Sequence, residues 1–166
     1  MNKNDIREHV TKYGNKRVVI TPALINKWWG IFNREVFNGK LPTKPDRLDL
    51  KDIHCYTKSR KKNKQKERQT LYGYSLSGKD YTLGINILRV HSRQFFLAVL
   101  VHEMVHAYVD MFYPVRLSRC AHGKAFFEFR DIVRDLGLPF EIYYDDEDVW
   151  KDMNLKVPTY ELLEWL

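Results

Sequence analysis

The sequence predicts an α+β fold in which helices pack on a small antiparallel three-stranded sheet. Three observations predict it. One helical segment is followed by three extended segments and then by two more helical segments. Short polar turns join the expected strands, and such turns favour antiparallel neighbours. The length of 166 residues is sufficient for one domain and short for two, so residues 1–166 are expected to form a single unit.

The first expected helix begins at Thr21-Pro22, where threonine caps the helix and proline occupies its first position. It ends at Asn38-Gly39, a pair suited to the turn after a helix. The apolar residues between these signals recur at helical spacing: Leu24, Trp28, Ile31, Phe32 and Val36.

The expected strands cover residues 48–56, 70–75 and 81–87, with a turn at residues 77–80 between the last two. A helix from Gln94 to Asp110 is apolar nearly all round and should therefore be buried. A second helix should follow His122-Gly123 and close at Gly137. The folded core is expected to span about residues 22–138, with an acidic extension at 139–166.

Composition restricts the class of protein. The chain is 44% hydrophobic and 14% aromatic, which is ordinary for a globular protein. Neither a membrane-spanning apolar stretch nor a secretory signal is expected. Two cysteines cannot make a disulfide framework or a four-cysteine zinc ribbon, so a reducing, cytoplasmic setting is the expectation. A monomer is expected.

Charge is unevenly distributed along the chain. Residues 139–166 hold two lysines and eight acidic residues, a difference of −6, so the total of +7 leaves +13 for the first 138 residues. A body this basic should attract polyanions, nucleic acid first among them. The strongest candidates for non-specific DNA contacts lie in one run without apolar residues: Lys58, Arg60, Lys61, Lys62, Lys64, Lys66 and Arg68. The same run would also serve as a solubilising hairpin tip.

One motif carries chemistry. His102 and His106 are four residues apart on the expected buried helix, so both imidazoles can face one ion. Neutral nitrogen ligands at that separation suit tetrahedral zinc. Glu103 sits about 100° around the helix, where it can reach a water at the metal and act as the base in hydrolysis.

A catalytic zinc ion usually has three protein ligands. His122, Glu128 and Cys120 are all candidates for the third, and the spacing does not choose among them. Asp110 lies four residues after His106 and is a candidate to orient that imidazole by accepting a hydrogen bond from its second ring nitrogen. Tyr113, Arg116 and Arg119 are candidates to stabilise the oxyanion of the transition state.

Two motifs in this order resemble the SprT-like (Spartan-type) metallopeptidase family. The first is His102-Glu-Met-Val-His-Ala-Tyr108, and the second is His122-Gly-Lys-Ala-Phe126. The segment Phe32-Asn-Arg-Glu-Val-Phe37-Asn-Gly-Lys-Leu41-Pro42 is similar to the first helix of that family and its exit turn. The resemblance runs from about residue 22 to about residue 138.

The resemblance implies a compact zincin-like, minimal gluzincin domain with one zinc ion, and it favours His122 as the third ligand. It also implies hydrolysis of protein substrates, including DNA-associated or DNA-crosslinked proteins. With no cysteine after Cys120, the chain lacks the zinc ribbon that bacterial members commonly carry. A stand-alone version of this kind would suit a virus or mobile element. The alternative function is a catalytically silent, zinc-containing module that binds nucleic acid or another protein.

Overall fold

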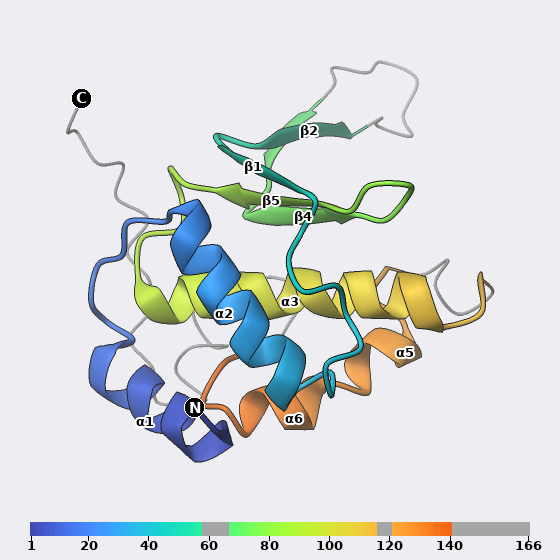
Figure 1. Ribbon diagram of the computed structural model, residues 1–166. Coiled ribbons are helices and arrows are strands. Elements are labelled where there is room, and N and C mark those ends of the chain that lie inside the picture. Colours follow the sequence, from blue (N-terminus) through green and yellow to red (C-terminus); the bar gives the residue numbers. More distant parts are fainter. Residues whose placement is uncertain (58–66, 116–120, 141–166) are drawn as a thin grey trace.

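The protein consists of helices packed on a three-stranded mixed sheet, so the predicted α+β class is confirmed (Figure 1). The computed structural model describes residues 1–57, 67–115 and 121–140. Its helices are α1 (Lys3–Tyr13), α2 (Pro22–Glu35), α3 (Arg93–Phe112), α5 (Lys124–Phe127) and α6 (Arg130–Arg134). Its strands are β1 (Arg47–Lys51), β2 (His54–Thr57), β3 (Glu67–Thr70), β4 (Gly73–Leu76) and β5 (Thr82–Asn86).

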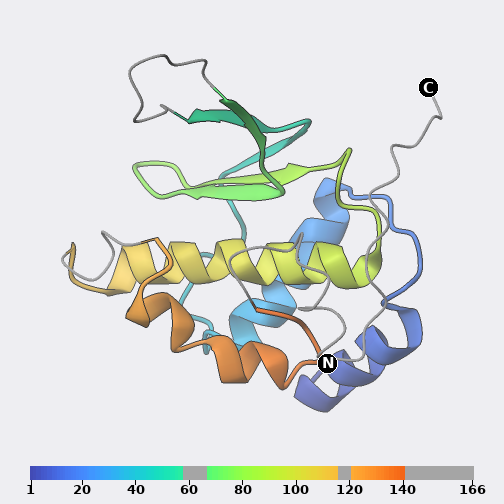
Figure 2. The same cartoon turned by 180° about the vertical axis from the view of Figure 1, so that it is seen from behind.

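Helix α3 is the centre of the fold. The three-stranded sheet lies on one side of it, α1, α5 and α6 lie on the opposite side, and α2 crosses it on the face turned to the viewer in Figure 1 (Figures 1 and 2). Because both sides are covered, nearly the whole helix is buried, as its uniformly apolar sequence predicts. The helix is long and apolar enough to cross a membrane by length and composition, but most of it is enclosed by the protein, as expected for a core helix.

The three-stranded sheet has the order β1-β5-β4 and presents one apolar face to α3. On that face Leu83 and Ile85 of β5 are fully buried. Their parallel neighbours on β1 are Leu48 and Leu50, which pack against the same core. The opposite face is polar, and there Tyr74 donates a hydrogen bond to Asp49. This alternation follows from the two-residue period of a strand.

The prediction of a purely antiparallel sheet is wrong in one respect. Strands β4 and β5 are antiparallel across a short turn, as expected, but β1 runs parallel to β5. The segment expected as one strand at 48–56 is divided into β1 and β2, and β2 pairs instead with β3 in a separate two-stranded sheet. Turn length therefore predicted only the pairing of strands that are adjacent in the chain.

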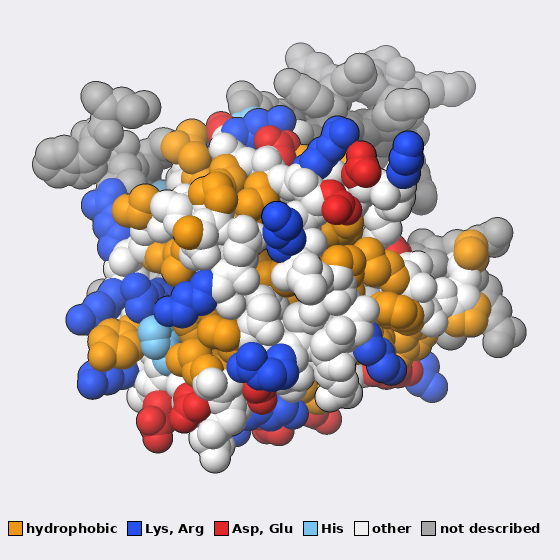
Figure 3. All heavy atoms as spheres, in the orientation of Figure 1, with side chains coloured by type: hydrophobic (Ala, Val, Ile, Leu, Met, Phe, Trp, Pro, Cys, Tyr) orange, Lys and Arg blue, Asp and Glu red, His pale blue; other side chains and the backbone are white. Residues whose placement is uncertain are grey.

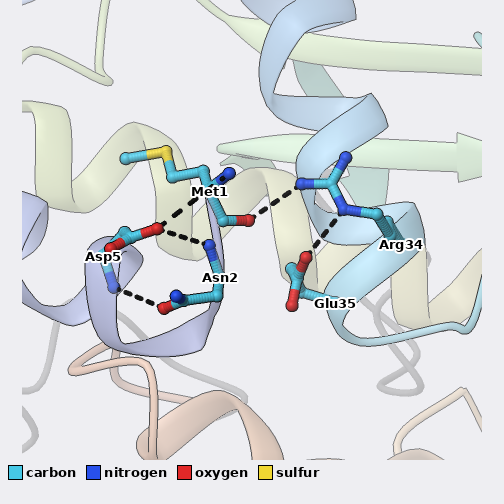
Figure 4. Close-up of polar contacts among 5 residues, drawn as sticks. All are labelled: Met1, Asn2, Asp5, Arg34 and Glu35. Carbon is cyan, nitrogen blue, oxygen red and sulfur yellow. Dashed lines mark hydrogen bonds and ion pairs between the residues drawn. The ribbon is translucent and has the colours of Figure 1, made fainter.

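Helix α1 was not predicted. Asn2 and Asp5 form a reciprocal capping box at its start, a signal that stands in the sequence. Buried Ile6 and Val10 attach the helix to the core. Figure 4 shows that the Arg34 guanidinium near the end of α2 donates a hydrogen bond to the carbonyl oxygen of Met1, so the N-terminal segment is also tied to α2.

The second predicted helix is broken into α5 and α6, separated at Glu128 and Phe129. Helix α6 ends at Arg134, three residues before the expected end, and the turn that follows it closes at Gly137, whose left-handed φ of 78° favours glycine. The buried cluster extends beyond the expected bounds of 22–138, with α1 at one end and Phe140 at the other. The remainder of the acidic extension, residues 141–166, lies outside the described residues.

Candidate metal centre

Three imidazoles converge at the middle of the fold. His102 and His106 lie one turn apart on α3, and His122 lies in the turn that precedes α5. Their Nε2 atoms form a nearly equilateral triangle: 3.1 Å from His102 to His106, 3.1 Å from His102 to His122 and 3.2 Å from His106 to His122. This cluster could hold one metal ion.

The triangle fits a tetrahedral ion of zinc-like size. Ligand nitrogens at about 2.0–2.1 Å from zinc in tetrahedral geometry lie about 3.3–3.4 Å from one another. The observed edges are shorter than this by only a few tenths of an ångström. Three ring nitrogens cannot all satisfy one another by hydrogen bonding, because a neutral imidazole has one donor and one acceptor. A cation at this position would accept all three lone pairs.

The protonation states also favour metal binding. Burial, together with a smaller electrostatic contribution from His122, lowers the pKa of His106 to about 4. Burial also lowers the pKa of His122 below its usual value. Both rings are therefore neutral at pH 7, and a metal ion would not have to displace a proton from them.

Glu103 is buried beside this cluster. Only 6% of its surface is exposed, and burial raises the pKa of its carboxyl group to about 8. No hydrogen bond or ion pair joins Glu103 to any other residue within 1–57, 67–115 and 121–140. An acid held in such surroundings is costly to the fold, and strongly shifted acids of this kind concentrate at functional sites.

The ring of Phe126 in α5 contacts all three imidazoles. Its ring centroid lies 4.8 Å from that of His102, 4.6 Å from that of His106 and 4.9 Å from that of His122. The ring of Phe140 stacks on that of Phe126, with the two centroids 4.6 Å apart. Sequence reasoning placed Phe140 in the acidic extension and missed its contribution here, since nothing in the local pattern distinguishes it.

Tyr81 was also missed as a neighbour of the site. Its ring is buried and lies against Trp29, and its hydroxyl accepts a hydrogen bond from Ser75. Burial raises the pKa of Tyr81, and the nearby charges of Glu103 and Asp110 raise it further. The tyrosine is therefore a neutral group close to the acid. Only the tertiary structure brings it there, from the turn before β5.

The other predicted site residues fall elsewhere. Glu128 is not part of the histidine cluster, and instead its carboxylate accepts a hydrogen bond from Tyr113 at 2.5 Å. Asp110 is exposed and accepts a hydrogen bond from Ser77. Cys120, Arg116, Arg119 and the basic run from Lys58 to Lys66 lie outside the described residues, and Arg68 lies in β3.

Comparison with known proteins adds no further support for a function: no protein-family model, no curated protein and no solved structure matches the chain.

Proposed function

We propose that the chain is a zinc-dependent peptidase of the SprT-like type, with His102, His106 and His122 as metal ligands and Glu103 as the general base. The observation that carries this proposal is the Nε2 triangle, with edges of 3.1–3.2 Å, beside a buried and unpaired glutamate. A purely structural zinc site has four closed ligands and no use for an acid. Here three imidazoles leave a fourth position for substrate or water.

The proposed roles follow from the chemistry of the side chains. A bound zinc ion would supply Lewis acidity toward a water molecule and a peptide carbonyl. Glu103 would take the proton from the attacking water and deliver it to the leaving amine. The apolar surroundings of Glu103 keep its proton affinity high, which suits a group that must both accept and return a proton near neutral pH.

The position of β4 supports a peptide substrate. It is an edge strand of the three-stranded sheet and packs along α3, the helix that carries two of the ligands. An edge strand offers unpaired backbone groups to which an extended chain can add. A protein segment bound there would pass beside the histidine cluster.

Zinc content and protein hydrolysis, measured on the same preparation, test the proposal. The purified chain should hold one zinc ion per molecule and cleave an unfolded substrate such as casein, and a chelator should remove both properties. Bound zinc without hydrolysis of any protein, with or without DNA present, would favour the silent module. Absence of zinc binding would refute both the peptidase and the silent zinc-containing module.

We further propose that the chain associates with nucleic acid through a basic face formed by α1 and the start of α3. The Nζ atoms of Lys12 and Lys16 lie 5.3 Å and 5.1 Å from the ring centroid of Tyr13, and the Arg93 guanidinium lies 5.9 Å from it. Arg93 also donates a hydrogen bond to His9. Figure 3 shows Lys and Arg side chains gathered around a histidine at this side of the molecule.

These cations are not neutralised by acids in the described part of the chain, where the ion pairs involve other residues. Cations interleaved with aromatic rings suit a single strand, since phosphates and bases can both be contacted. Binding of a labelled single-stranded oligonucleotide should weaken steeply with salt. The double variant Lys12→Glu/Lys16→Glu should weaken it at least about tenfold. Lys44→Glu/Lys79→Glu makes the same charge change elsewhere, and equal losses in both double variants would refute this face.

A further inference from the structure

Gly73, the first residue of β4, faces the buried glutamate of α3. In a strand, alternate residues point to opposite faces. Gly73 is the antiparallel partner of Ile85, which is fully buried on the α3 side of the sheet. Paired residues of an antiparallel sheet point to the same face, so a side chain at residue 73 would point toward α3.

The approach of this glycine to α3 leaves no room for a side chain. A β-carbon added at Gly73 would lie 2.9 Å from Cγ1 of Val99, 3.0 Å from Cγ of Glu103 and 3.1 Å from Oε1 of Glu103. Separations this short require the neighbours to move. Val99 is stiff in a helix because its branched side chain has one strongly preferred rotamer. The contact with Val99 is the shortest and is relieved by a small shift of the backbone, whereas the two contacts with Glu103 are relieved when its flexible side chain moves by a few tenths of an ångström.

Backbone conformation does not require glycine at this position. The positive φ values that favour glycine are found at Gly39 and Gly137, and Gly73 is not among them. What requires glycine here is space, and the atoms that occupy the space include the carboxylate proposed to be the base.

We propose that Gly73 is a positioning residue for Glu103: the bare backbone of β4 forms one wall of the slot that holds the carboxylate beside the three imidazoles. This inference rests on the proposed peptidase function. A methyl group at residue 73 would displace the carboxylate while leaving His102, His106 and His122 in place. Displacement of a reacting group by up to about 1 Å lowers turnover by as much as about a hundredfold.

The first test compares two alanine variants of neighbouring strands. Gly73→Ala should lower kcat about 10- to 100-fold, with KM and zinc content little changed. Gly84→Ala is the matched control, because its β-carbon would overlap the ring of Tyr74 on the opposite face of the same sheet. It should lower the melting temperature but keep kcat per folded molecule. Equal losses of kcat in the two variants would mean that Gly73 acts only through general packing.

The second test needs neither activity nor metal. The cost of Gly73→Ala to the stability of the zinc-free protein is measured by urea unfolding in two backgrounds, the native chain and Glu103→Ala. Removing the glutamate side chain removes two of the three close contacts. The shift of the urea midpoint caused by Gly73→Ala should therefore be clearly smaller in the Glu103→Ala background. The same shift in both backgrounds overturns the inference.

The two tests separate the inference from the function on which it rests. If the native zinc-loaded protein cleaves no substrate, the peptidase proposal fails, and the urea experiment still decides whether Gly73 holds Glu103. If Gly73→Ala does not fold at all, the double variant Gly73→Ala/Glu103→Ala should recover the fold. Failure of that double variant to fold also counts against the inference.

Discussion

Glu103 combines two opposing demands at a single residue. Its burial next to apolar side chains destabilises the ionised form, and its pKa of about 8 reflects that cost. Hydrolysis, however, needs a carboxylate that can become a base. The residue is therefore expected to reduce stability in the metal-free protein and to support turnover in the zinc-loaded one.

Replacing Glu103 by glutamine should separate these two effects. The folded pKa is raised above the unfolded value, so the folded protein holds the extra proton between about pH 4.5 and 8, and stability is lost as pH rises through that range. Glutamine removes this loss. We expect Glu103→Gln to stabilise the metal-free protein above pH 8 by a quantity on the order of 5 kcal/mol, while zinc is retained and peptidase activity is abolished. Unfolding followed at pH 6 and pH 9, together with an activity assay, checks both parts, and unimpaired turnover would remove Glu103 from the mechanism.

The assignment of the third ligand makes a second prediction at the residue scale. His122 completes the Nε2 triangle, whereas Glu128 is bonded to Tyr113. His122→Ala should therefore reduce zinc affinity by two orders of magnitude or more, roughly the effect of losing one ligand from a preformed site. Glu128→Ala is the control and should leave zinc affinity unchanged. Competition with a chromophoric chelator measures both zinc affinities. A similar loss in the two variants would contradict the assignment of His122, rather than Glu128, as the third ligand.

At the scale of elements, the histidine cluster depends on the contact between α3 and α5. The two helices meet at Phe126, whose ring lies within 5 Å of all three imidazole centroids. The ring is almost fully buried and is backed by Phe140. The contact fixes the directions of the histidine rings as well as the docking of α5.

Removal of the Phe126 ring should therefore affect folding and zinc binding together. Phe126→Ala creates a cavity in the core and should lower the free energy of unfolding by about 3–5 kcal/mol. Zinc affinity should fall as well, because His102 and His106 lose the surface that orients them. Phe126→Leu keeps most of the volume and should show a smaller effect on both. Calorimetry and zinc titration check this prediction, which fails if zinc affinity is unchanged in a folded Phe126→Ala variant.

At the scale of the whole molecule, the neutral histidines couple folding to pH. The folded pKa of His106, about 4, is lower than the usual 6.5, so the unfolded chain binds the extra proton between these values. Stability present above pH 6.5 should therefore be lost as pH falls toward 4. The contribution of His106 is on the order of 3 kcal/mol.

Thermal melting of the metal-free protein at pH 7.5 and pH 4.5 tests this coupling, with His106→Gln as the comparison. The native chain should lose more stability on acidification than the variant, because glutamine does not titrate. Zinc added at pH 7.5 should raise the melting temperature in proportion to the logarithm of its concentration. Parallel pH profiles for the native chain and the variant would contradict the assigned protonation state.

The sequence by itself determined the parts of this protein that depend on local spacing. The uniform apolar run from Phe95 to Val101 predicts a buried helix, and the four-residue interval from His102 to His106 places two imidazoles on one face of it. Thr21-Pro22 marks the start of α2, and Gly137 closes the turn that follows α6. Each of these signals is a short stretch of sequence that lies within or next to the element it predicts.

Only the tertiary structure decided what depends on contacts between distant segments. The choice of His122 over Glu128, the parallel pairing of β1 with β5 and the place of Phe140 behind Phe126 all join residues that no local pattern relates. The same holds for Gly73, whose missing side chain has meaning only because β4 packs against Glu103. Spacing within a helix fixes directions around its axis, but which element meets that face is set by packing of the whole core.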